Sequence, residues 1–529
     1  MARTLYRIYL YGVWLLLMIF VTVAVGVVLG TLLAASPLNG PSQTTLTGAV
    51  ITQQIVLALL AVIIAGSLGG LHYWLIRRDI RDDPSAASGP VRALFLNGVE
   101  AGSVLVGVPM IANAFASLAN PYSGGIANLV AGGLVALGLF ALLEAERRQF
   151  SVAPGAAIVF QRLHLYGIQL VLLFIAASFW LNAIDTSATV IFVNAGLLTS
   201  GCGSGGICAG APELLPNLVW LWAGAAVVTL AIVGYGYLSR HDGRSVIRLV
   251  MHYAAYTFGL IFVIVAVDEA ASLLVSLIQS QTVTASDFLL RYEFIAPATF
   301  GVLAVAVYAS WLARDALRDT DSAQALGLTT MAVTIAVLAV PFWIGCALLA
   351  YNLLISVSPA IPRPSADQWT SAVALLIAGI GYIPFSLRMR VLARRYTPAT
   401  ARRGLVFALL GAGTLTAAAG LVVMLYAIVT NVVGAALDNW QTIARGGGVT
   451  LLIGVIVSGI YFSRVQVEGW FHRAAPVALP AAGSPEAPSP VAVTSTDHDI
   501  EDVLDAVLAG RLTRDEAAAR LRGLSVSRI

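Results

Sequence analysis

A chain of 529 residues that is 59% hydrophobic and only 11% charged does not have the balance of a soluble globular protein. Its formal net charge of +3 rests on arginine alone, because the sequence contains no lysine. A surplus this small does not indicate a nucleic-acid partner, and a phosphate-binding loop of the Gly-rich, lysine-containing type is excluded.

Twelve apolar segments follow one another along the chain. Each has about the 20 residues that a helix needs to cross a hydrocarbon core of ~30 Å, and only helices satisfy their backbone groups within one segment. The sequence therefore predicts an all-α, polytopic integral membrane protein. We interpret the first segment as a retained helix, since it is too long for a cleaved signal peptide. The segments are 8–35, 49–76, 92–118, 125–143, 162–184, 217–238, 248–279, 294–312, 326–356, 369–387, 403–435 and 447–463.

The arginines fall almost entirely on one side of these segments. Only Arg291, Arg363 and Arg445 lie in the loops of the opposite side, against 27 at the N-terminus, in the even-to-odd connections and after the last segment. Positive charge is retained on the cytoplasmic side of a membrane. The asymmetry predicts a multi-pass protein of the inner (plasma) membrane with both termini in the cytoplasm.

The segments come in pairs, and residue patterns recur between the pairs. Arg7 precedes Tyr11 by four positions as Arg162 precedes Tyr166, and His252 follows Arg248 at the same offset. Second segments end in aromatic residues followed by arginine, a pattern that suits anchoring at the headgroup level. These echoes predict six helix-pair repeats. Their approximate bounds are 5–89, 90–161, 162–247, 248–325, 326–402 and 403–473.

The Arg-x-x-x-Tyr opening, the long first helix and the aromatic-basic close resemble the bacterial membrane repeat called Domain of Unknown Function 5671. The resemblance covers residues 1–473 as tandem copies and is clearest in the first, third and fourth pairs. The later pairs depart from it, with Ala325-Leu-Gly in place of the aromatic opening. The family has no established activity, so the resemblance implies an architecture and no catalytic residue.

The composition changes sharply after Arg473. Residues 474–497 are rich in Ala, Pro and Ser and are typical of a disordered linker, and residues 498–529 predict a helical hairpin. The hairpin resembles the short C-terminal helical domain of bacterial membrane proteins, which implies docking or self-association. Because it cannot bury much core alone, we expect it to pack on a cytoplasmic protein partner, a second copy or the membrane surface. Its characteristic residues are Leu504, Leu508, Leu512, Thr513, Glu516 and Leu521.

Glu100 is the leading candidate for an intramembrane polar site. It lies eight residues after Arg92, about 12 Å along a helix, where an unpaired carboxylate is costly. Asn97 and Ser103 share its face. One interpretation is a proton- or solute-responsive site in a cavity, and the other is a polar group hydrogen-bonded between packed helices.

Asp268 and Glu269 are the other carboxylates inside a predicted segment. Asp268 follows Arg248 by twenty residues, or about 30 Å, which returns it to the opposite interface. We expect solvation there or pairing with Arg291 in preference to a functional role. Glu269 points about 100° away from Asp268 around the helix, so the two carboxylates cannot act together at one site.

Two of the three cysteines, Cys202 and Cys208, lie in a glycine-rich stretch of the loop 185–216 on the side opposite to the arginines. An outward-facing pair of this kind favours a disulfide, with a metal or redox pair as the alternative. Cys346 is expected to be an inert packing residue. No metal or cofactor motif is apparent.

Two functional hypotheses follow. The first is a non-catalytic membrane assembly or sensor scaffold whose cytoplasmic hairpin docks a partner. The second is a transporter or channel for a small solute or ion that uses the polar site near Glu100. An integral-membrane enzyme ranks third, because no cluster of His and acidic residues gathers at one face of the predicted helices.

Overall fold

The computed structural model divides the chain into two units, Met1–Val465 and Gln466–Ile529. The second unit is described only as far as Val467, so the predicted linker and hairpin lie outside the described residues. The first unit contains only helices as regular structure among the residues that are described. These residues are 2–34, 48–119, 125–149, 155–195, 211–242, 245–279, 294–317, 320–357, 364–393, 400–432 and 439–467.

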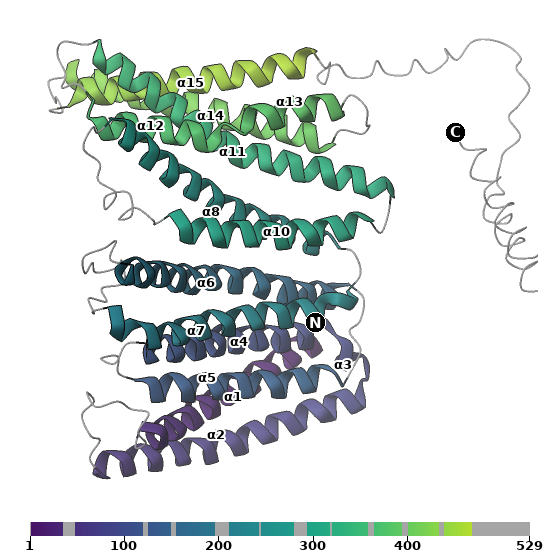
Figure 1. The fold of residues 1–529 in the computed structure, drawn as a ribbon. Helices are drawn as coiled ribbons and strands as arrows, with labels where there is room; N and C mark the ends of the chain where they lie inside the picture. Colours follow the sequence, from purple (N-terminus) through teal and green to yellow (C-terminus); the bar gives the residue numbers. More distant parts are fainter. Residues whose placement is uncertain are drawn as a thin grey trace, which may run out of the picture. The chain divides into compact units, whose positions relative to one another are not determined.

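The helices follow the predicted apolar segments in order (Figure 1). In the described part of the chain, 12 spans are long and apolar enough to cross a membrane, which confirms the predicted fold class. The elements are α1 (Ala2–Ala34), α2 (Gly48–Asp82), α3 (Ser85–Ser88), α4 (Pro90–Leu118), α5 (Ile126–Arg147), α6 (Ala156–Asn194), α7 (Ala211–Leu238), the 3-10 turn η2 (Ser239–His241), α8 (Val246–Gln279), α10 (Ile295–Leu317), α11 (Thr320–Ser356), α12 (Ala366–Gly379), α13 (Tyr382–Ala393), α14 (Thr400–Val432) and α15 (Trp440–Val467).

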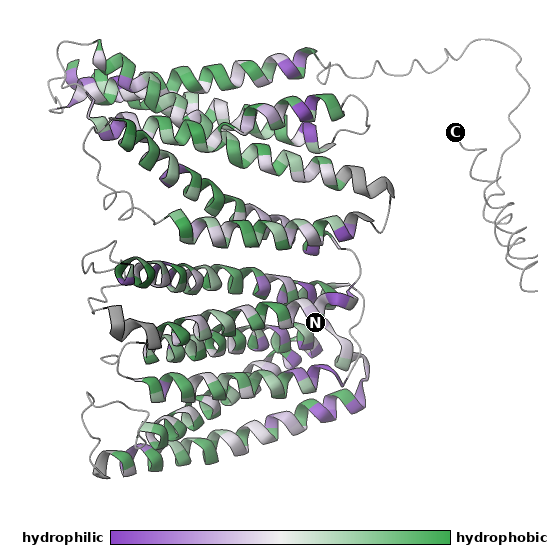
Figure 2. Cartoon of the chain, in the orientation of Figure 1, coloured by the Kyte–Doolittle hydropathy of each residue, from purple (hydrophilic) through white to green (hydrophobic). Residues whose placement is uncertain are grey.

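The surface of the helices supports a lipid environment. Large aliphatic side chains stand outward in mid-helix, including Ile63 at 64%, Leu142 at 65% and Leu230 at 68% exposure. Soluble proteins rarely expose apolar surface of this extent, whereas lipid tails solvate it. Hydrophilic residues gather instead at the arginine-bearing ends of α2, α10, α13 and α15 (Figure 2).

Two helix boundaries differ from the prediction. Helix α6 continues ten residues past the expected end at 184, to Asn194. Residues 185–194 contain no glycine or proline, and Ala183 packs in a cluster with Leu221 of α7, so nothing stops the helix at 184. The loop that holds Cys202 and Cys208 is correspondingly shorter, and both cysteines lie outside the described residues, where the disulfide stays a prediction. Cys346 is a free thiol in α11.

The predicted tenth segment is divided into α12 and α13. Its start is fixed by a capping box in which Ser365 and Gln368 bond each other's backbone amides. The break follows from Pro384, which has no N–H and whose ring excludes a helical carbonyl at position 380. By contrast, α4 and α11 continue through Pro109 and Pro341.

Consecutive helices make the most extensive contacts, and glycine often lies where they cross. A Cβ at Gly107 of α4 would touch α5, and one at Gly301 of α10 would stand 2.9 Å from the Gly259 carbonyl oxygen of α8. Small residues of this kind let helix backbones approach closely in membranes. Contacts between neighbours do not require internal repetition, so the six-fold repeat stays a prediction.

The last pair of helices has close glycine contacts from both sides. Gly413 and Gly420 of α14 face Ser458 and Leu451 of α15, and Gly447 and Gly454 of α15 face Met424 and Ala417 of α14. Each pair of glycines is spaced by seven residues, which keeps both on one helix face. The sequence also contains two GxxxG motifs, Gly26/Gly30 and Gly66/Gly70. Only Gly30 faces a close neighbour, the Asn128 side chain of α5, and the other three glycines have open space.

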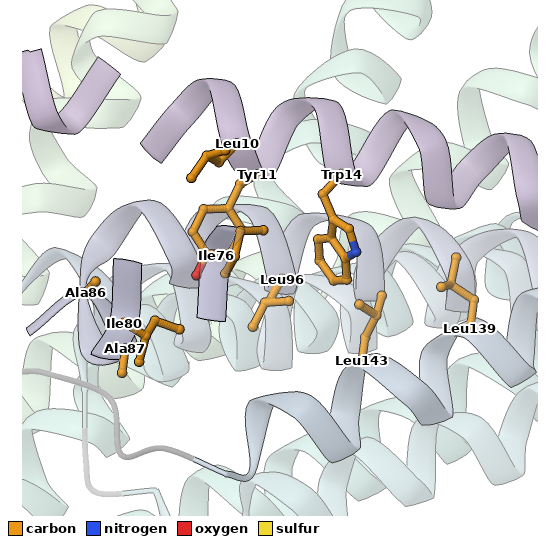
Figure 3. Packing of buried hydrophobic residues seen from close by; sticks show 10 residues of the cluster. All are labelled: Leu10, Tyr11, Trp14, Ile76, Ile80, Ala86, Ala87, Leu96, Leu139 and Leu143. Atoms are coloured by element: carbon orange, nitrogen blue, oxygen red, sulfur yellow. The ribbon is translucent and has the colours of Figure 1, made fainter. Parts of the chain in front are cut away.

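The core of the first pairs is formed where α1 crosses the others at its arginine-bearing end. Tyr11 and Trp14 extend from α1 toward Leu96 of α4 and Leu143 of α5, and all four are at least 93% buried (Figure 3). Position 11 is thus an internal packing position, four residues after Arg7.

Candidate functional site

A row of partly buried ion pairs lies at the arginine-bearing ends of the first four helix pairs. In each pair the arginine that opens the first helix binds a carboxylate at the end of the second helix. We call this row the arginine–acid ladder. Its four rungs are Arg7–Asp79 at 2.7 Å, Arg92–Glu146 at 3.1 Å, Arg162–Asp242 at 3.0 Å and Arg248–Asp315 at 2.8 Å.

The rungs are connected to further polar groups. Arg77 of α2 binds the same Glu146 carboxylate at 2.7 Å as Arg92 of α4, so the second rung joins the first two pairs. Tyr166, four residues after Arg162, donates from its hydroxyl to Asp242 at 3.0 Å. The ladder thus gives a structural role to the recurring arginines and to Tyr166, whereas the Tyr11 hydroxyl has no hydrogen-bond partner among the described residues.

Asp83, just beyond α2, is a second carboxylate partner of Arg7 and adds a pH-dependent contact beside the first rung. Hydrogen bonds from Ser85 and the Arg7 guanidinium lower the pKa of Asp83 from its ordinary value of 3.8 to about 2. A lowered pKa means that this contact stabilises the fold above pH 4 and loses its contribution as the pH falls toward 2. We expect an Asp83→Asn variant to have a lower unfolding midpoint than the parent at pH 5–7, and the difference should shrink as the pH falls through 2. A difference that keeps its full size at pH 2 would contradict this assignment.

Beside the second rung lies a second buried group that we call the Glu100 cluster: Glu100, Glu144, Arg147, His164 and Tyr235. Glu100 is 0% exposed. Its Oε2 lies 3.4 Å from Nε of Arg147 and 3.6 Å from Nε2 of His164. The same guanidinium binds Glu144 at 2.8 Å and 2.5 Å. Three helices, α4, α5 and α6, therefore meet at one carboxylate.

The polar contacts of the Glu100 cluster are incomplete. Neither oxygen of Glu100 has a hydrogen bond of normal geometry within the described residues. The Tyr235 hydroxyl lies 3.3 Å from Nε2 of His164, and Nδ1 of His164 also has no partner there. Two carboxylates thus share one buried guanidinium, because Arg148, the second partner of Glu144, is 64% exposed. The arrangement can hold a charge and can accept or pass a proton.

The other members of the predicted stripe do not join this cluster through their side chains. Asn97 is 4% exposed and donates to the Ala93 carbonyl at 2.7 Å, and Ser103 is 6% exposed and donates to the Val99 carbonyl at 2.8 Å. Both bonds lie within α4, where Ser and Asn side chains commonly satisfy the preceding turn. Of the three residues on this face, only Glu100 makes an ionic contact between helices.

Asp268 and Glu269 are separate from Glu100. Asp268 lies about 30 Å along α8 from the fourth rung and is partly buried, with Oδ1 unpartnered among the described residues, while Glu269 is exposed. Arg291, its predicted partner, is outside the described residues. Within those residues no group of three or more His, Cys, Asp and Glu side chains could hold a metal ion.

Three cavities bear on the choice between a pore and a packed core, and Glu100 lines none of them. Two lie among the first helices: one of about 480 Å³ includes Gly102 and Ser103, and one of about 620 Å³ includes Thr31, Gln54 and Asn128. The third, of about 440 Å³, lies among α11, α14 and α15. Ser103 is therefore the only member of the predicted polar stripe that borders one of these cavities.

Sequence reasoning missed Glu144, Arg147, His164 and Tyr235 as members of the site. The predicted fourth segment ended at 143, whereas α5 runs to Arg147 and brings Glu144 inside. An acid next to the basic cluster recurs at the end of the second helices, at Asp79, Glu146, Asp242 and Asp315. That recurrence could have identified the acids that pair with the arginines.

Comparison with models of known protein families, with curated proteins and with solved structures gives no match. The function proposed below therefore rests on the geometry of this chain.

Proposed function

We propose that this multi-pass membrane protein is a non-catalytic assembly or sensor scaffold. The observation that carries the proposal is the environment of Glu100, which is 0% exposed and contacts Arg147 and His164. A substrate pathway needs its polar site to be reachable, whereas buried ion pairs between helices resist separation. The arginine–acid ladder extends this fixed layer across the first four pairs.

The proposal includes an orientation and an architecture. The arginine-bearing ends face the cytoplasm, so both termini are cytoplasmic, and the hairpin 498–529 is the docking element. The recurrence of one arginine–acid pair in four consecutive helix pairs supports the internal repetition and, with it, membership of the Domain of Unknown Function 5671 type of repeat.

The test compares the full chain with a chain that ends at residue 474 and with a Leu508→Asp variant, which introduces charge on the hairpin's apolar face. Cross-linking in intact cells should join the full chain to a defined protein or to a second copy, and both variants should lose that product. Their unfolding midpoints in detergent should match the parent. Retention of the product without the hairpin would contradict the docking role.

A second candidate, proton-coupled transport, is favoured by the two Glu100 oxygens that lack hydrogen bonds and by the adjacent His164–Tyr235 contact. In sealed vesicles, proton uptake that depends on the protein and disappears in Glu100→Gln would support this candidate. Equal proton leak in the parent and the variant would favour the scaffold.

A further inference from the structure

The last helices differ from the first ten in their charge balance. Between Asp367 and Glu468 the sequence contains one carboxylate, Asp438, which precedes α15 at the end opposite to the arginines. The same stretch contributes seven arginines to the arginine-bearing end: Arg388, Arg390, Arg394, Arg395, Arg402, Arg403 and Arg464. All the ion pairs described above lie between Arg3 and Asp315. Along this stretch of sequence the arginine-bearing end thus carries seven arginines and no carboxylate.

Two of these arginines, Arg464 and Arg390, lie near a pair of tyrosines. The Arg464 guanidinium stands 4.7 Å from the ring centre of Tyr461, and Arg390 is close enough to act electrostatically on the same tyrosine. The Tyr461 hydroxyl is hydrogen-bonded to Tyr382 of α13. Tyr461 belongs to an aromatic-arginine ending of the kind that suits headgroup anchoring, but at 1% exposure it is an internal group.

The cavity of about 440 Å³ begins on the same helix faces. Val457 on its wall precedes Arg464 by seven residues, and Leu409 follows Arg402 by seven, so in each helix the wall and the arginine share a face about 10 Å apart. Trp343 of α11 lines the cavity and lies 6.1 Å from the Tyr382 ring. The indole Nε1 of Trp343 is buried without a hydrogen-bond partner within the described residues.

We propose that this site binds one anionic phospholipid from the leaflet at the arginine-bearing end. The phosphate lies against Arg464 and Arg390, because guanidinium groups are strong phosphate ligands. One acyl chain occupies the crevice, whose wall reaches from Val457 to Thr450, about 10–21 Å from Arg464. That depth matches one leaflet of a hydrocarbon core of ~30 Å. An ester oxygen of the lipid accepts from the free Trp343 indole.

The first experiment measures affinity. Full-length protein in detergent is titrated with phosphatidylglycerol, with phosphatidylcholine of the same chains and with glycerol phosphate, and the unfolding midpoint is followed. Phosphatidylglycerol should raise the midpoint at concentrations where the other two have no effect. Arg464→Gln should weaken the apparent affinity about fivefold, the effect of one arginine at an anionic surface. Ala412→Phe, which fills the crevice, should weaken it at least as much.

Two matched controls should keep the parental affinity: Arg314→Gln, an exposed arginine on α10, and Ala418→Phe, an exposed α14 position that does not line the crevice. Equal stabilisation by phosphatidylcholine would overturn the headgroup assignment. Equal stabilisation by glycerol phosphate would show a site for free phosphate and overturn the lipid assignment. Equal losses in the site and control variants would also overturn the proposal.

The second experiment reports occupancy independently of stability. Phosphatidylglycerol with brominated chains should quench tryptophan fluorescence in the parent, and the site-dependent part of the quenching should disappear in Trp343→Phe. Because this readout compares folded proteins, it stays informative if Arg464→Gln lowers stability. Identical quenching in the parent and in Trp343→Phe would contradict a chain in the crevice.

Discussion

Replacing Arg147 by glutamine should destabilise the membrane domain by about 3–5 kcal/mol, the cost of removing one partner from a buried ion pair. Its guanidinium is 13% exposed and is the buried cation between Glu100 and Glu144. Without it, two carboxylates remain in the interior with the exposed Arg148 as their nearest remaining cation. The measurement is the free energy of unfolding in mixed micelles, where a loss of this size separates clearly from the parent.

Arg148 is the matched control for this prediction. It is the next residue and binds the same Glu144, but its side chain is 64% exposed. Exposed pairs contribute about 1 kcal/mol or less, so Arg148→Gln should be nearly neutral. Adding Glu144→Gln to the Arg147→Gln variant should recover part of the loss, because the carboxylate that Arg147 contacted at 2.8 Å is then removed as well. Equal losses at positions 147 and 148 would contradict the assigned burial.

Alanine at Gly454 should clearly destabilise the last helix pair. Its Cβ would stand 2.3 Å from the backbone nitrogen of Ala417, so α14 and α15 would have to separate. Overpacking of this kind costs about 1–3 kcal/mol. The loss should appear as a lower unfolding midpoint in detergent.

Gly459 provides the control on the same helix, because nothing lies within 4 Å of a Cβ placed there. Gly459→Ala should be neutral or stabilise by up to about 1 kcal/mol, the difference in helix propensity. If both alanine variants behaved alike, the close crossing of α14 and α15 would not contribute to stability.

The sequence predicted the helices well because their signal is local. An apolar run of about 20 residues identifies a spanning helix without reference to any other part of the chain. The boundaries were less well predicted where a contact or a proline decides them, as at Asn194 and Pro384. The close crossing at Gly454 depends on which helix lies opposite, and the glycine pattern alone does not contain that information.

The same distinction applies to the candidate site. Glu100 was identified from its depth in the membrane, which follows from its distance from Arg92 along a single helix. Arg147 and His164 belong to other helices, and their approach to Glu100 depends on how those helices pack. Tyr461 shows the same dependence on packing: its aromatic-arginine pattern suits headgroup anchoring, whereas contact with Tyr382 of α13 makes it an internal residue.

The arginine–acid ladder also implies an order of events during synthesis. Asp79 follows Arg7 by 72 residues, so at ~5–20 residues per second the ribosome delivers it about 4–14 s later. During that interval Arg7 is an uncompensated cation that holds the first helix in its proposed orientation. When α2 arrives, the same guanidinium becomes an internal bond. The arginine of each rung therefore first orients its helix in the membrane and later forms an ion pair between helices. If the acid were synthesised soon after the arginine, the orienting effect would be weaker and the final ion pair would be unchanged.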